Sequence, residues 1–116
     1  MIRTVLVLTL LQSGAAAPQP AVKIVGIGAA SCARFNQEIG TTPTLERDYL
    51  GWAQGFMSGA LMRAPAGVDE DLDLLPPSRP LQDQAAFLRD FCRAHPDQDY
   101  MDAVRALYHL LRGPKL

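Results

Sequence analysis

The longest regular pattern of apolar positions lies near the middle of the chain. An apolar residue recurs there every three or four positions, at Leu45, Tyr49, Trp52, Phe56 and Ala60. This is the period of one face of an α-helix. Thr42 and Pro43 precede the stretch and suit the cap and the first turn of a helix. The pattern therefore predicts a helix of about twenty residues that begins near Thr42.

A second regularity runs along the same predicted helix. Gly51, Gly55 and Gly59 are spaced four residues apart, so they lie on one side of the helix. Each glycine costs a helix about 1 kcal/mol relative to alanine, and three of them call for a compensating interaction. We expect another helix to pack closely into the groove that they leave. A slot for a small ligand is the alternative interpretation of the same stripe.

Three further helices are predicted around this one. The first covers Cys32 to Ile39 and is expected to end at Gly40, since glycine often closes a helix in a left-handed conformation. The segment Ala64 to Pro80 has no period and is rich in Pro, Asp and Leu, which predicts a long irregular loop. Ser78 and Pro80 then open a helix whose expected apolar face is Leu81, Ala85, Leu88, Cys92 and His95.

The last predicted helix follows Pro96, which ends the one before it. Asp97 or Asp99 is expected to cap this helix, and Gly113 with Pro114 is expected to end it. Its apolar stripe is Tyr100, Val104, Leu107 and Leu111. No convincing strand pattern is left, so the predicted fold is all-α, a small single-domain bundle of about four helices.

The start of the chain has the pattern of an export signal. Arg3 is followed by an apolar stretch from Val5 to Leu11 and by small residues from Ser13 to Ala17. We expect a signal peptide over residues 1–17, cleaved between 15 and 17, an extended arm over 18–30 and a helical domain over 31–116. The apolar stretch is shorter than the ~20 residues of a membrane span, although a retained helical anchor is the alternative. The predicted location is periplasmic or secreted.

Cys32 and Cys92 are the two cysteines of the chain. In an oxidising compartment two thiols that can meet are usually joined, so we predict a disulfide between them. Under the chain-entropy model a bond closing a loop of this size stabilises the fold by roughly 4 kcal/mol. A zinc site with His95 and His109 is a less favoured alternative because the spacing is not that of metal ligands. A nucleophilic role for Cys92 is less favoured because it requires a free thiol, which an oxidising compartment disfavours.

Charge and motifs exclude several classes of function. The net charge is −1, and loss of a leader carrying Arg3 leaves ten basic against twelve acidic residues, which disfavours nucleic acid. Gly26-Ile27-Gly28 resembles a dinucleotide-binding turn but lacks its third glycine and its βαβ unit. Asp69, Asp71 and Asp73 resemble the start of a calcium loop, yet Leu74 replaces the turn glycine. No catalytic residue, metal or cofactor is therefore predicted, and the chain is expected not to be an enzyme.

Three sequence motifs carry a family resemblance. They are Gly28-x-x-Ser31-Cys32, then Trp52-x-x-Gly55-Phe56-x-x-Gly59, then Phe91-Cys92-Arg93-Ala94-His95-Pro96. The chain resembles small exported proteobacterial helical proteins, among them the Rap/Tai immunity proteins of type VI secretion. It is more remotely similar to the HdeA-like acid-stress chaperones in its size, leader and single disulfide. The immunity proteins usually carry further cysteines, which this chain lacks.

The resemblance implies a protein that binds another protein, such as a secreted effector that attacks the cell wall. An acid-stress chaperone is the alternative, and a homodimer is a further hypothesis. Irregular loops on a rigid scaffold often carry recognition, so the acidic loop is the expected contact. Its candidate residues are Asp69, Glu70, Asp71 and Asp73. No contact with a membrane is expected once the signal peptide is removed.

Overall fold

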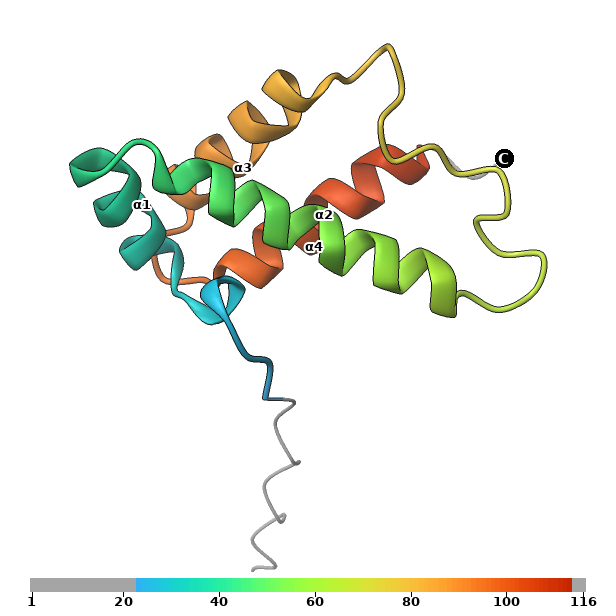
Figure 1. Cartoon of the computed structure of the whole chain (residues 1–116), viewed down its shortest axis with the longest axis horizontal. Coiled ribbons are helices and arrows are strands. Elements are labelled where there is room, and N and C mark those ends of the chain that lie inside the picture. Colours follow the sequence, from blue (N-terminus) through green and yellow to red (C-terminus); the bar gives the residue numbers. More distant parts are fainter. Residues whose placement is uncertain (1–22, 114–116) are drawn as a thin grey trace, which may run out of the picture.

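The architecture is all-α, as the sequence predicts. In the computed structural model, residues 23–113 are described, and they contain four α-helices, one short 3-10 helix and no strand. The elements are η1 (Ile27–Ala29), α1 (Cys32–Thr41), α2 (Leu45–Arg63), α3 (Leu81–Ala94) and α4 (Tyr100–Arg112). Figure 1 shows α2 crossing α4, while α1 and α3 lie toward one end of that pair. The predicted signal peptide, residues 1–17, lies outside the described residues.

Three aromatic side chains form the centre of the core. Phe35 of α1, Tyr49 of α2 and Tyr100 of α4 are buried, and their ring centroids lie 4.8 to 4.9 Å apart. Aromatic pairs at this separation add to the stabilisation that burial alone gives. Because each ring comes from a different helix, this one cluster fixes the arrangement of three of the four helices. Apolar residues of α2, α3 and α4 extend it, namely Ala53, Met57, Leu88, Ala103, Val104 and Leu107.

The buried face of α2 differs from the predicted stripe. Tyr49, Ala53 and Met57 are the fully buried residues of α2, whereas Trp52 and Phe56 are only partly buried. The expected packing of a helix against the glycines is wrong. Gly51, Gly55 and Gly59 are exposed, and a methyl group added to any of them would meet nothing within 4 Å among the described residues.

Two predicted helix ends are also corrected. Helix α1 runs through Gly40 to Thr41, and Gly40 does not adopt a positive φ, so it does not close the helix. Helix α2 begins at Leu45 rather than near Thr42, and Thr44 is its N-cap. The last helix begins as expected, because Asp99 and Asp102 form a reciprocal capping box. His95, expected on the buried face of α3, follows the helix and is exposed.

The predicted disulfide is present and lies within a network of backbone hydrogen bonds. The sulfur atoms of Cys32 and Cys92 are 2.09 Å apart. Asn36 donates to the carbonyl of Cys92 at 3.0 Å, which ties α1 to α3 a second time. The backbone N–H of Cys32 donates to the carbonyl of Gln98 at 2.8 Å, and that of Tyr100 donates to Ala30 at 3.0 Å. We call this region, residues 30–36 with 92–100, the disulfide end.

The 3-10 helix η1 lies within the segment predicted as an extended arm. It packs against α2, where Gly28 lies directly on the indole ring of Trp52. A Cβ atom on Gly28 would lie only 2.2 Å from two atoms of that ring. Gly28 therefore serves close packing, which gives a structural reason for the glycine pair that resembles a dinucleotide turn.

Candidate functional site

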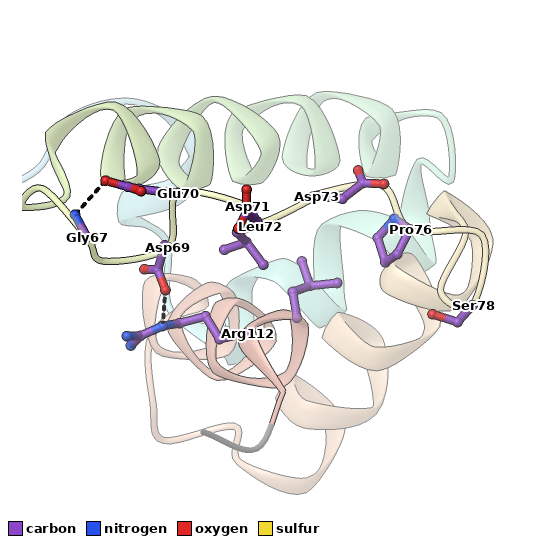
Figure 2. Close-up of a pocket in the computed structure, with 10 residues that line it drawn as sticks. Gly67, Asp69, Glu70, Asp71, Leu72, Asp73, Pro76, Ser78 and Arg112 are labelled. Atoms are coloured by element: carbon purple, nitrogen blue, oxygen red, sulfur yellow. Dashed lines mark hydrogen bonds and ion pairs between the residues drawn. The ribbon is translucent and has the colours of Figure 1, made fainter. Parts of the chain in front are cut away.

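The long loop between α2 and α3 forms an open pocket against the end of α4. The pocket has a volume of about 540 Å³, and most of its lining comes from the loop itself. Figure 2 shows this loop passing over the last turn of α4. All four acidic residues singled out from the sequence line the pocket, opposite Arg112 of α4, and they are Asp69, Glu70, Asp71 and Asp73. The structure therefore brings the predicted contact residues together at one place.

Asp69 fixes the loop to α4. Its carboxylate accepts a hydrogen bond from the Tyr108 hydroxyl at 2.9 Å and one from Arg112 Nε at 2.8 Å. The Asp69 and Arg112 side chains are only 9% and 18% exposed, so this ion pair is shielded from solvent. Burial and the hydrogen bond to Asp69 both raise the pKa of Tyr108, so this phenol stays protonated and keeps donating.

The backbone around Asp69 is held in an uncommon conformation. Asp69 has a φ of 58° and Gly67 a φ of 81°, both in the left-handed region. Aspartate tolerates this region better than most residues other than glycine. The turn directs the Asp69 side chain toward Arg112 (Figure 2). Sequence analysis assigned Asp69 to partner contact, whereas the structure uses both of its carboxylate oxygens to anchor the loop.

The other three acidic residues face solvent. Glu70 accepts a hydrogen bond from the backbone N–H of Gly67 at 2.7 Å, and Asp73 accepts one from Leu75 at 2.8 Å. Asp71 has no hydrogen-bond or ion-pair partner among residues 23–113. Each of the three is exposed, and in Figure 2 Asp71 and Asp73 point away from Arg112. The loop thus presents three carboxylates on a backbone that local hydrogen bonds hold in place.

A buried glutamine supports the far half of the loop. Gln84 of α3 is completely buried, and its amide nitrogen donates to the carbonyls of Leu74 at 2.9 Å and of Arg79 at 3.1 Å. The roles of Gln84, Tyr108 and Arg112 were not predicted from the sequence. Gln84 does lie three residues after Leu81 and four before Leu88, on the apolar side of its helix, and a polar residue at such a position signals a buried hydrogen bond.

A second cluster of ionisable groups joins α1 to α2. The Tyr49 hydroxyl donates to Glu38 at 2.5 Å, and Arg34 Nε donates to the other oxygen of the same carboxylate at 2.7 Å. The hydrogen bond from Tyr49, followed by that from Arg34, lowers the pKa of Glu38. Burial, followed by the hydrogen bond to Glu38, raises the pKa of Tyr49. The Tyr49 oxygen is therefore a hydrogen-bond donor rather than a nucleophile at neutral pH.

The remaining candidates from the sequence are not brought together. His95 and His109 are both exposed, and the ring of His95 packs against Phe91 with the centroids 4.7 Å apart. Within residues 23–113 no group of three His, Cys, Asp or Glu side chains is placed to hold a metal ion. In the same part of the chain, no helix is long and apolar enough to cross a membrane.

Comparison of the chain with protein-family models, with curated proteins and with solved structures finds no match. The resemblance to immunity proteins therefore stays a prediction from the sequence motifs, and that to HdeA-like chaperones stays one from the size, the expected leader and the cysteine pair. The acidic loop is the place in the described chain where the predicted residues, a pocket and exposed charge coincide.

Proposed function

We propose that this protein is a non-enzymatic periplasmic or secreted domain that binds another protein through its acidic loop, residues 64–80. The role is similar to that of immunity proteins that inhibit a cell-wall-targeting effector. One observation carries the proposal: Asp69 is tied to α4 while Glu70, Asp71 and Asp73 stay exposed around an open pocket. The anchor and the contact residues are thus different members of the same acidic group.

This arrangement suits recognition for two physical reasons. A loop held by Asp69 and Gln84 loses less conformational entropy on binding than a free loop of the same length. Exposed carboxylates of one sign attract a basic partner and speed the encounter, an effect that salt weakens. The expected partner is therefore a protein with a basic patch, such as a cationic enzyme that cleaves peptidoglycan.

The test measures binding to a panel of purified cationic peptidoglycan-cleaving enzymes by calorimetry, together with inhibition of peptidoglycan release. The informative variant replaces Glu70, Asp71 and Asp73 with the neutral amides. Its affinity for whichever enzyme of the panel binds the wild-type protein is expected to weaken at least about tenfold at low ionic strength. Each lost charge pair contributes up to about 1 kcal/mol. Wild-type affinity is expected to fall with added salt.

A matched control neutralises three exposed acidic residues outside the loop, at Asp83, Asp90 and Asp97. This control has the same net charge as the loop variant and is expected to bind almost as well as wild type. Equal weakening by both variants would show that overall charge, and not the loop, attracts the partner. A panel in which no enzyme is bound or inhibited would contradict the immunity-like role.

A second function, an acid-stress chaperone, is favoured by a separate observation. Three carboxylates each join two elements of the fold: Glu38 holds Tyr49 of α2, Glu46 holds Arg89 of α3, and Asp69 holds Arg112 of α4. Protonation in acid would weaken all three links. Loosening of the helices would then expose apolar surface for unfolding client proteins.

Acid exposure separates this second function from the first. The expected result is that an environment-sensitive apolar dye binds below about pH 3 and that the protein then prevents aggregation of an acid-sensitive client. The variant Glu38→Gln, Glu46→Gln, Asp69→Asn imitates the protonated state and is expected to bind the dye near neutral pH. A protein that binds no dye and protects no client in acid would exclude the chaperone role.

A further inference from the structure

The outward face of α2 is apolar and has no partner within the described chain. Met62 is 85% exposed, and a groove of about 520 Å³ runs beside it, lined by Gly55, Phe56, Gly59, Ala60, Met62 and Arg63. The three glycines on this face meet nothing, although each costs the helix about 1 kcal/mol. Glycines at four-residue spacing allow another backbone to approach closely. The face therefore has the shape of a helix-packing surface that the single chain leaves open.

Two charges of opposite sign lie at the ends of this face. Asp48 is in the first turn of α2 and Arg63 is in its last turn, and both are exposed. Neither forms an ion pair within residues 23–113. At 100° per residue their positions differ by only about 60° around the helix, and they are about 22 Å apart along it. The face is thus negative at one end and positive at the other.

We propose that two copies of this chain form a dimer by packing α2 against α2 in antiparallel orientation. Antiparallel packing about a two-fold axis places Asp48 of each copy opposite Arg63 of the partner subunit, so the same charge pair forms twice. The same register sets Gly55 opposite Phe56 and Gly59 opposite Trp52 of the partner subunit. Charge and side-chain size are then both complementary, since Gly55 and Gly59 each lie opposite an aromatic residue and Gly51 lies opposite Ala60.

A second copy fits this surface better than an unrelated protein because the face is complementary to itself. A two-fold interface requires that one patch supply both halves of every contact. Asp48 and Arg63 supply the two opposite charges of each ion pair. The glycines supply the space, and Trp52 and Phe56 supply the large side chains that fill it. This interface involves α2 and does not depend on the acidic loop or on the proposed binding of a basic protein.

The first experiment reverses the charges in the full oxidised chain and measures self-association by sedimentation over a concentration series. Asp48→Arg and Arg63→Asp are each expected to weaken the dimer about tenfold at low ionic strength, because each places two like charges face to face. The double variant with both reversals is expected to recover wild-type affinity. Asp83→Arg is the matched control, since Asp83 is exposed and also lies in the first turn of its helix, α3.

The second experiment fills the glycine groove. Gly55→Leu is expected to weaken the dimer at least about tenfold, while urea unfolding of the dilute monomer shows equal or higher stability, because leucine favours a helix over glycine. Gly40→Leu, on the exposed side of α1, is the control and is expected to leave the dimer unchanged.

Three results would overturn the proposal. One is a wild-type protein that stays monomeric up to about 1 mM. Another is a dimer that Gly55→Leu does not weaken. The third is a double charge reversal that fails to restore the affinity lost by the single reversals. Substitution of Glu70, Asp71 and Asp73 is expected to leave this dimer intact, so the test of the interface is separate from that of the acidic loop.

Discussion

The disulfide end and the acidic loop both join distant parts of the chain, but they do so with different kinds of bond. At the disulfide end, Cys32 and Cys92 are fully buried, and backbone hydrogen bonds reinforce the covalent link. At the acidic loop, side-chain hydrogen bonds from Tyr108, Arg112 and Gln84 hold the chain. The first region resists changes in pH and salt, whereas the second depends on the charge of one carboxylate.

A chain of this size thus combines a rigid part with a part that responds to pH and salt. A small core supplies limited stability, so a covalent link at one end stabilises the whole domain by restricting the unfolded state. The loop at the other end then has freedom to expose charge without unfolding the bundle. This comparison can be tested by breaking each region separately.

The largest expected effect comes from removing the covalent link. Replacement of Cys32 and Cys92 by alanine is expected to lower the free energy of unfolding by about 4 kcal/mol, since a long loop of the unfolded chain is released. Urea unfolding followed by circular dichroism measures the change. The comparison would fail if this double variant were as stable as the wild-type protein with its disulfide intact.

The next largest effect is expected where η1 packs on α2, beside the disulfide end. Gly28→Ala places a methyl group 2.2 Å from the rigid indole of Trp52, and overpacking of this kind costs about 2 kcal/mol. Gly40→Ala is the matched control, because a methyl group there meets nothing and helix propensity rises. Thermal unfolding of both variants measures the contrast. Equal stability of the two variants would show that η1 does not pack tightly on Trp52.

A somewhat smaller effect is expected at the acidic loop. Asp69→Asn keeps a side chain that tolerates positive φ but removes the charge that binds Arg112, at a cost of about 1.5 kcal/mol. Asp71→Asn is the control and is expected to change stability by less than about 0.5 kcal/mol, because Asp71 is exposed. Hydrogen exchange of residues 64–80 adds a local measurement. Loop amides as protected in Asp69→Asn as in wild type would contradict the anchoring role.

The smallest effect concerns pH and the link between α1 and α2. The pKa of Glu38 in the folded protein is lowered from its ordinary value of 4.5, so its stabilising contribution is present above that pH and is lost as the pH falls through the lowered value. Glu38→Gln lacks this contribution. The gap between the urea midpoints of wild type and Glu38→Gln is therefore expected to shrink between pH 7 and about pH 3. A constant gap would show that the Glu38 charge does not stabilise the fold.

Local sequence signals predicted the elements better than their packing. The loop and the start of α4 at Asp99 followed from composition and capping residues, which act over a few positions. The end of α1 was predicted wrongly because Gly40 keeps helical backbone angles and the helix continues to Thr41, whose hydroxyl donates to the carbonyl of Gln37. The apolar stripe of α2 is broad, so the sequence left open which edge of it η1 and α4 would cover.

For the candidate site too, local features were predicted better than contacts between distant residues. The four acidic residues predicted as partner contacts line one pocket, but the sequence pattern assigned one role to all of them. The anchoring role of Asp69 depends on Tyr108 and Arg112, which lie about forty residues further along the chain and have no local signal that links them to it. The role of Gln84 was not predicted because both of its hydrogen-bond acceptors are backbone carbonyls of the loop. Every residue has such a carbonyl, so no residue type in the loop indicates this contact.

Helical periodicity and the pair of cysteines were enough to predict an all-α chain with a disulfide between Cys32 and Cys92, because both act through local or covalent chemistry. Three other features follow from tertiary packing: Gly28 lies against Trp52, Asp69 faces inward and the glycines of α2 face solvent. Each of these features depends on which distant surfaces meet. The pattern of residues within one helix constrains that choice without fixing it.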